Sequence, residues 1–259
     1  MSAKVLYEVR AGVGIITLNR PEVHNAMDDE AAALYKDALD TALSDDAVRA
    51  VLLQGAGTSF CSGRDTTMLG HRAKDESDYH FVLHHQQKRL TVMDSPKPFV
   101  AALKGAVIGG GCETALSCDI RVSSTDLKMA LPEIHYGILP DTGGTQLMTA
   151  LIGPARTKYM VMTGERIDAQ TALEWGAVDF LVPPEELDAK ALEIATKIAA
   201  KPPIALAMAK TMIDQAHAGA VRNGIAQELL AQTALFKTED YQEARAALRE
   251  KRKPVYKGK

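Results

Sequence analysis

The sequence predicts an α/β protein with a mixed first part and a helical last part. Up to about residue 185, short aliphatic runs that suit strands alternate with stretches that suit helices, and this order excludes an all-helical or an all-β protein. After residue 185 the strand signals end, and helical stretches separated by prolines and a glycine follow. We therefore expect a core at residues 1–185 and a helical region at residues 186–259.

The first third of the chain reads as a hairpin, a helix and another strand. A turn at Gly12 separates two runs rich in β-branched residues, and Asp28 is suited to cap a helix that extends to about Ser44. The strands expected here are residues 5–9, 14–18 and 48–53. A polar stretch over residues 70–77 then precedes a helix over residues 78–93.

The middle of the chain combines short strands with further helices. The strands expected are residues 99–103, 120–123, 128–130 and 178–182. One helix begins near Thr142, and Pro154 suits the first turn of the next. Asp168 can cap a third helix, which Gly176 ends.

The helical region predicts self-association. Four helices are expected, over residues 187–200, 204–217, 221–238 and 240–251, with Gly219 between the second and the third. Their apolar side chains are more than a small appendage can bury alone, among them Leu206, Met208, Ile213, Leu229 and Leu235. We therefore expect a helical oligomerisation region.

The composition of the chain argues against several classes of function. The 259 residues are 46% hydrophobic and 24% charged with a formal net charge of −3, which gives no support for binding of nucleic acid or of a membrane surface. The start has no apolar signal segment and no run approaches the roughly 20 apolar residues of a membrane span, so a cytoplasmic location is expected. No metal is expected, because no carboxylate or cysteine pattern completes a site around His71, His80, His84 and His85.

The block at residues 109–113, three glycines followed by Cys112 and Glu113, lies between an apolar strand and a helix start. A helix start presents free backbone N–H groups, and glycines let a ligand atom come close to them. Glu113, on the first turn, then faces the same pocket. This geometry suggests an oxyanion site with an acid or base beside it; an anion cradle or a tight turn is the alternative.

A second glycine-marked turn occupies residues 60–65. Gly63 permits an unusual backbone, and Asp65 can cap a short helix that opens at Thr66. The backbone N–H of Arg64 is therefore a second candidate donor to an anion. Alternatively, this is an ordinary turn with Arg64 in solvent.

Four blocks in this order and spacing resemble the crotonase (enoyl-CoA hydratase/isomerase) superfamily over nearly the full length. They are residues 19–26, 59–65, 109–113 and 140–145. The resemblance implies a spiral of repeated strand-strand-helix turns, followed by a helical region used for trimerisation, often as a dimer of trimers. It also implies an acyl-CoA thioester as substrate and no separate cofactor, because coenzyme A is part of the substrate.

The resemblance assigns roles to individual residues. The thioester carbonyl is expected between the backbone N–H groups of Arg64 and Gly110. Residues expected to bind CoA or the acyl group are Val23, His24, Ser62, Arg64, Met68, Leu69, Gly109, Gly110 and Pro132. Hydratases of the family use two glutamates at the positions of Glu113 and Glu133, and one water can supply both the hydroxide and the proton that the reaction adds when two carboxyl groups share it. The resemblance therefore favours an enoyl-CoA hydratase.

Two alternatives to the hydratase remain at this point. An enoyl-CoA isomerase would move a double bond with Glu133 or Asp141 as the proton carrier. Asp141 stands where some isomerases and dehalogenases of the family have a working aspartate, although it could also only cap the helix that starts near Thr142. The most distant alternative is a non-catalytic relative that binds CoA esters or RNA.

Overall fold

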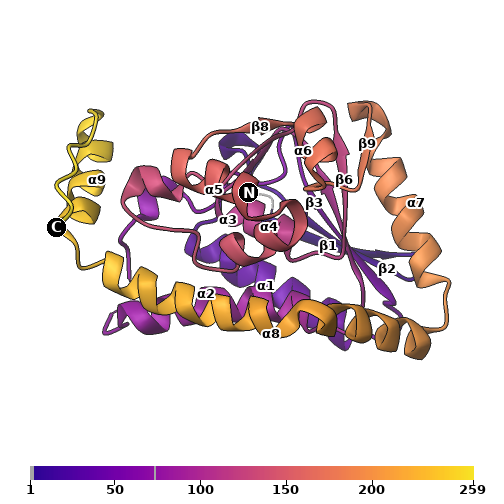
Figure 1. The fold of residues 1–259 in the computed structure, drawn as a ribbon. Helices are drawn as coiled ribbons and strands as arrows, with labels where there is room; N and C mark the ends of the chain where they lie inside the picture. Colours follow the sequence, from indigo (N-terminus) through magenta and orange to yellow (C-terminus); the bar gives the residue numbers. More distant parts are fainter. Residues whose placement is uncertain (1–2, 73) are drawn as a thin grey trace.

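A six-stranded sheet forms the centre of the protein (Figure 1). The structure is a computed structural model that describes residues 3–72 and 74–259. The strand order is β1-β2-β3-β4-β6-β9, with β1 antiparallel to β2 and all other neighbours parallel. These strands are β1 (Val5–Arg10), β2 (Val13–Leu18), β3 (Ala50–Gly55), β4 (Phe99–Leu103), β6 (Ile120–Ser124) and β9 (Phe180–Val182).

A second, three-stranded sheet has the order β5-β7-β8. Its strands are β5 (Ala106–Ile108), β7 (Lys128–Ala130) and β8 (Ile167–Asp168). Successive strands alternate between the sheets: β4 and β6 lie in the large sheet, and β5 and β7, which follow them, lie in the small one. This alternation produces the expected spiral of strand-strand-helix turns. The sequence pattern did not predict β5 and β8, which have only three and two residues.

The remaining elements agree closely with the sequence analysis over the first 185 residues. The helices are α1 (Asp29–Ser44), α2 (Asp78–Met93), α3 (Gly110–Leu116), α4 (Gly144–Ile152), α5 (Pro154–Thr163) and α6 (Ala169–Trp175), with short 3-10 turns η1 (Pro21–Val23), η2 (Thr66–Met68) and η3 (Glu133–Tyr136) between them. Asp28, Asp65 and Asp168 cap α1, η2 and α6 as predicted, each accepting a backbone N–H of the first turn.

Helix α7 (Leu187–Ala199) covers one face of the large sheet. Leu187, Ala191, Ala195 and Ala199 are buried at intervals of four residues and pack against β2, β3, β4 and β6. Every residue of β4 is buried, because helices cover the sheet on both faces. The boundary predicted at residue 185 divides strands from helices along the sequence, and α7 packs with the core.

Helix α8 (Pro203–Leu235) is one continuous helix of 33 residues, so the break predicted at Gly219 is wrong. A single glycine inside a helix costs only about 1 kcal/mol, and packing along α2 and α4 offsets this cost. Figure 1 shows α8 running beside α2 along one side of the molecule, with α9 (Glu239–Glu250) at its end. A cluster of buried side chains joins α2, α8 and α9: Val82, Ile138, Leu229, Phe236 and Tyr241.

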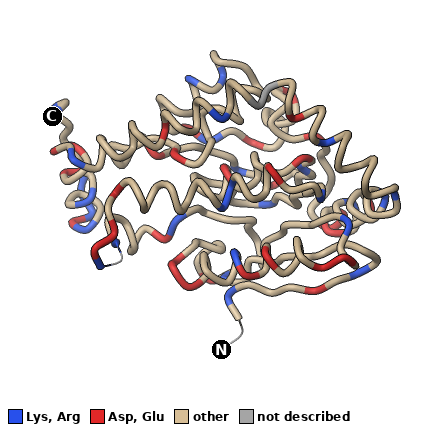
Figure 2. Tube along the Cα trace, turned by 90° about the horizontal axis from the view of Figure 1, so that it is seen from below, with Lys and Arg blue, Asp and Glu red and all other residues tan. Residues whose placement is uncertain are grey.

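The surface carries mixed charge. Figure 2 shows Lys and Arg interspersed with Asp and Glu along the helices seen from this side. In the described part of the chain, none of the helices is long and apolar enough to cross a membrane. Of the apolar positions expected to be exposed in the helical region, Met208 and Ile213 are 62% and 70% exposed, whereas Leu229 is buried in the cluster beside α9.

Candidate active site

Most of the predicted site residues meet in one cavity of ≈ 190 Å³. Ser62, Arg64, Leu69, Gly109, Gly110, Glu113, Pro132, Glu133 and Asp141 all line it. Val23, His24 and Met68 do not line it. The C-terminal region also lines it, through Gln232 of α8, Phe236 directly after α8 and Tyr241 of α9. The helical region therefore contributes to the walls of the site in the same chain.

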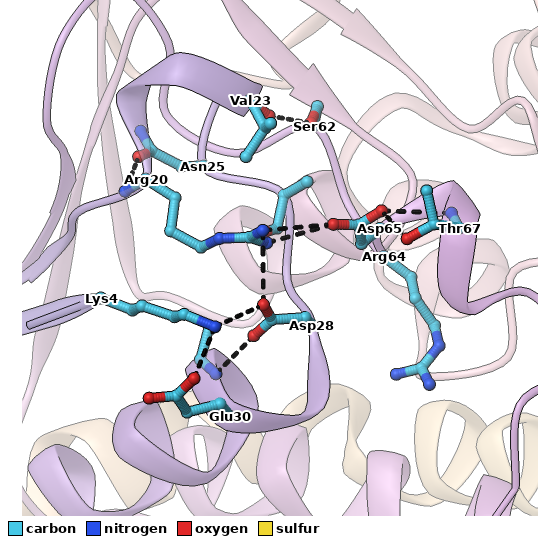
Figure 3. A network of polar contacts seen from close by, with 12 residues as sticks. Lys4, Arg20, Val23, Asn25, Asp28, Glu30, Ser62, Arg64, Asp65 and Thr67 are labelled. Atoms are coloured by element: carbon cyan, nitrogen blue, oxygen red, sulfur yellow. Dashed lines mark hydrogen bonds and ion pairs between the residues drawn. The ribbon is translucent and has the colours of Figure 1, made fainter. Parts of the chain in front are cut away.

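A polar network holds the turn that carries Arg64 (Figure 3). The Arg20 guanidinium donates to the Asp65 carboxylate at 3.3 Å and forms an ion pair with Asp28 at 3.3 Å. Lys4 also pairs with Asp28, at 2.7 Å. The Arg20, Asp28 and Asp65 side chains are largely buried. The network therefore ties residues on both sides of the turn together and holds the backbone at Arg64.

The N–H group of Arg64 is free for a ligand. Met27 donates its N–H to the Gly63 carbonyl at 2.8 Å, and the Asp65 N–H donates to the Met27 carbonyl at 3.0 Å. In such a parallel bridge the intervening residue directs its own N–H away from the partner. Within the described residues, neither the Arg64 N–H nor the Gly110 N–H donates a hydrogen bond to protein.

Two glycines allow these N–H groups to come together. Gly63 has a φ of +90°, and a Cβ on it would lie 2.7 Å from the Ile108 carbonyl oxygen and 3.3 Å from the Gly110 nitrogen. Gly109 has a φ of +54°, and a Cβ there would lie 2.9 Å from an oxygen of Glu133. Any larger residue at either position would separate the two segments or displace the glutamate.

Glu113 projects from the first turn of α3 and is 2% exposed. Its Oε1 accepts the backbone N–H groups of Thr142 at 2.8 Å and Gly144 at 3.0 Å. No hydrogen bond from the described residues reaches its Oε2. Oε1 of Glu113 is therefore held at the start of α4 by two hydrogen-bond donors, which stabilise negative charge on the carboxylate. Oε2 is available to a ligand.

Glu133 lies across the cavity at the start of η3. Burial, and then the charge of Glu113, raise the pKa of the Glu133 carboxyl well above its usual range. Its Oε2 is buried and has no hydrogen-bond partner in the described structure. Burial beside a second carboxylate favours the protonated form of the Glu133 carboxyl, which makes Glu133 suited to donate a proton.

Asp141 does not cap a helix, so the capping interpretation of this residue is wrong. Helix α4 begins at Gly144 with Gly143 at the N-cap and no side-chain cap. The Asp141 carboxyl lines the cavity instead. Burial, and then the charges of Glu113 and Glu228, raise its pKa well above the usual range, as they do for Glu133.

A fourth carboxyl group, Glu228 of α8, was not found from the sequence. It is 5% exposed and accepts the N–H groups of Gly143 at 2.7 Å and Thr145 at 3.2 Å, together with the Thr145 hydroxyl. Glu113 and Glu228 thus both accept backbone N–H groups at the start of α4. Burial, and then the charge of Glu113, raise the pKa of Glu228 to about 7.

We expect Glu228→Gln to lower the free energy of unfolding by about 1–3 kcal/mol, because the amide leaves a buried N–H donor without an acceptor. The pKa of Glu228 is raised from 4.5 to about 7 on folding, so its contribution to stability is complete below pH 4.5 and is lost as the pH rises to about 7. Urea unfolding should therefore show a larger difference between the two proteins at pH 5 than at pH 8, and an equal difference at both would contradict the assigned shift.

The segments expected to hold CoA lie beside the cavity. The Ser62 hydroxyl donates to the Val23 carbonyl at 3.3 Å, and the Ser62 N–H donates to the His24 carbonyl at 3.0 Å. His24 has a φ of 53° and its ring contacts the Ser59 hydroxyl at 2.9 Å. Val23, His24 and Ser62 therefore form one hydrogen-bonded edge next to the Arg64 turn.

An α/β spiral with buried carboxyl groups beside free backbone N–H groups has the architecture of the crotonase superfamily. The chain belongs to the enoyl-CoA hydratase/isomerase family, whose family model matches residues 8–259. A short-chain-enoyl-CoA hydratase of Clostridium acetobutylicum is 35% identical over 251 residues, covering 96% of this chain and 95% of that protein. A 2,3-dehydroadipyl-CoA hydratase of Escherichia coli is 34% identical over 247 residues, covering 95% of each chain.

The solved structures agree with this assignment. The crystal structure of an enoyl-CoA hydratase from Mycobacterium avium subsp. paratuberculosis superposes with a TM-score of 0.87 at 27% identity, covering 98% of this chain and 99% of that one. An enoyl-CoA hydratase/isomerase from Xanthobacter autotrophicus gives 0.86 at 31% identity, covering 96% and 94%. The expected fold is therefore confirmed, including the helical C-terminal region.

Proposed function

We propose that this protein is an enoyl-CoA hydratase that adds water across the 2,3 double bond of a 2-enoyl-CoA thioester. The observation that carries the proposal is the meeting of Glu113 and Glu133 in one cavity beside the free N–H groups of Arg64 and Gly110. Relatives that are named hydratases, at 31–35% identity, support hydration over other reactions of the family.

The thioester carbonyl binds between the N–H groups of Arg64 and Gly110. When water attacks, negative charge moves to this oxygen, and each preorganised donor stabilises the enolate-like state by roughly 3 kcal/mol. The CoA portion lies along the edge formed by Val23, His24 and Ser62. This placement follows the resemblance and is supported by the position of that edge beside the Arg64 turn.

Glu113 acts as the base and Glu133 as the acid. Glu113 removes a proton from water as the oxygen bonds to the β carbon, and the electrons of the double bond move toward the thioester. Glu133 then gives its proton to the α carbon. The proton that Glu113 took from water passes to Glu133, which returns both carboxyl groups to their starting state. The net reaction is the addition of one water without oxidation or reduction, so the proposal includes no cofactor.

The test is a panel of 2-enoyl-CoA thioesters of increasing chain length, followed by loss of the conjugated-thioester absorbance. At least one member of the panel should be hydrated with a kcat/KM of roughly 10⁴ M⁻¹s⁻¹ or more, which is ordinary for an enzyme on its own substrate. Absence of hydration across the panel, with a folded protein, would overturn the proposal.

A second candidate, enoyl-CoA isomerisation, is favoured by the position of Asp141. Its buried carboxyl lines the same cavity as Glu133, and both pKa values are raised, so either group can carry a proton between the α and γ carbons of a 3-enoyl thioester. Appearance of the conjugated absorbance from a 3-enoyl-CoA would reveal this activity.

We also propose that the protein is a trimer or a dimer of trimers. Helix α8 has five large apolar side chains that the monomer leaves exposed to solvent: Ile204, Met208, Met212, Ile213 and Leu230. Exposed apolar surface of this kind is typical of an interface between subunits. Light scattering at micromolar concentration should give the mass of three or six chains, whereas a stable monomer of 27.9 kDa would refute the proposal.

A further inference from the structure

One face of helix α2 is basic where it lines the active-site cavity. Phe81, His85, Lys88 and Arg89 follow the i, i+4, i+7, i+8 spacing that places side chains on one side of a helix, and all four line the cavity. Three of these four side chains carry nitrogen. A pocket built only for a hydrocarbon chain would be lined by apolar residues at this face.

Most of the cations in the cavity already have protein partners. Arg64 pairs with Asp29 at 2.9 Å, and Arg72 pairs with Asp78 at 3.2 Å. Arg89 donates to the Gly110 carbonyl at 2.8 Å. The exception is the Lys88 ammonium, which has no hydrogen bond or ion pair to any residue within 3–72 and 74–259.

Lys88 is partly buried, so its lack of a counter-charge has an energetic cost. Burial, and then the charges of Arg89 and Arg64, lower the pKa of Lys88, and Asp29 is the acidic group that acts against them. The neighbouring His85 is affected in the same way: burial first, and then Lys88, Arg64 and Arg89, lower its pKa to about 4. Arg64, Lys88 and Arg89 therefore bring positive charge to the active-site cavity, which favours an anionic ligand group there. A neighbouring cleft, between α1 and α2, is of mixed charge, because Asp29, Asp40 and Glu76 also line it.

Ser62, one of the three residues of the edge expected to hold CoA, lines the active-site cavity together with Lys88. Lys88 lines both the active-site cavity and the neighbouring cleft of ≈ 490 Å³ between α1 and α2, and Phe81 and His85 are among the other residues that line both. Val23 and His24 line neither space. The apolar side chains suited to surround an acyl chain, such as Leu69 and Phe81, line the same cavity as Lys88.

We propose that Lys88 binds a carboxylate at the far end of the acyl chain, so that the substrate is a 2-enoyl-CoA whose acyl group carries a second carboxyl group. This inference rests on the proposed hydratase function. The methylene part of the chain is accommodated by the apolar wall of the cavity, formed by Leu69, Phe81, Ile138, Leu139 and Phe236. In a partly desolvated pocket, a contact between the Lys88 ammonium and a carboxylate contributes more to the binding free energy than a contact between the ammonium and water. A chain that ends in a methyl group would leave Lys88 unpaired.

The test compares two 2-enoyl thioesters of equal chain length, one ending in a methyl group and one in a carboxylate, at six and at eight carbons. The wild-type protein should show a kcat/KM about tenfold higher for the carboxylate-ended member. Lys88→Met should lower the ratio of the two kcat/KM values about tenfold, mainly through KM, and Lys88→Arg should retain part of the preference. Lys197→Met, which removes an exposed lysine of α7, is the matched control.

The outcomes separate the inference from the proposed function. If the wild type hydrates neither thioester, the proposed function itself fails. If Lys88→Met lowers both kcat/KM values equally in a protein with unchanged thermal unfolding, Lys88 contacts CoA and the inference is wrong. If the wild type prefers the methyl-ended thioester and Lys88→Met leaves the ratio unchanged, hydration stands and the carboxylate site is rejected.

Discussion

Glu113→Gln and Glu133→Gln should each lower kcat for hydration by about 100-fold or more. The expected size is that of losing one general acid or base, because glutamine neither accepts a proton from water nor gives one to carbon. In Glu113→Gln, the remaining amide oxygen can still accept the Thr142 and Gly144 N–H groups, so the fold is retained. Steady-state kinetics on the best 2-enoyl thioester measures the effect.

Two controls test whether the loss of kcat is specific to the chemical step. The affinity for the saturated acyl-CoA product analogue should change little, since the backbone N–H groups of Arg64 and Gly110 remain. Glu186→Gln, at an exposed position before α7, should keep full activity. If Glu113→Gln retained near-normal hydration, the shared-water mechanism would be wrong, and a single-acid site of the isomerase kind would explain the cavity better.

The local signals of the sequence predicted the parts of the site that lie on glycine-marked turns. Gly63 and Gly109 stand where the backbone has a positive φ, and this requirement is visible in the sequence because few other residues satisfy it. The bounds of α2, which follows the polar stretch at residues 70–77, were also predicted correctly. Such features depend on the nearest few residues alone.

The contribution of the C-terminal helices could not be predicted in the same way. Glu228 and Gln232 lie on one face of a long helix among alanines and leucines, where a polar residue normally faces solvent. Their burial follows from the packing of α8 on α4 and α2, which brings residues more than 80 positions apart into contact. Gly224 illustrates the same point, because a Cβ there would lie 2.0 Å from the Gln146 side chain.

The role of Asp141 also could not be predicted from the sequence, because it depends on tertiary contacts. Its sequence context, two residues before a pair of glycines, suits a helix cap as well as a catalytic residue. The start of α4 is instead satisfied by Glu113 and Glu228, which reach it from α3 and α8. With the helix start already occupied, the Asp141 carboxyl remains in the cavity.

We therefore expect Asp141→Asn to lower hydration turnover at least about tenfold, or ~1.4 kcal/mol in the activation barrier, without lowering thermal stability. Asparagine has nearly the same shape and capping ability, so a residue with only a structural role would tolerate the change. The charge of Asp141 also helps to raise the pKa of Glu133. Without it, the pKa of Glu133 falls, and a smaller fraction of Glu133 holds its proton at a given pH.

The pH profile of Asp141→Asn distinguishes this role from a simple loss of shape. An acid that must be protonated loses activity as the pH rises through its pKa, so the alkaline limb of kcat should move to lower pH in the variant. The comparison should be made with both a 2-enoyl and a 3-enoyl thioester. Loss confined to the 3-enoyl thioester would assign Asp141 to isomerisation beside hydration by the glutamates. Unchanged turnover on both, with an unshifted alkaline limb, would remove Asp141 from the chemistry, because its charge would then have no influence on the proton that Glu133 donates.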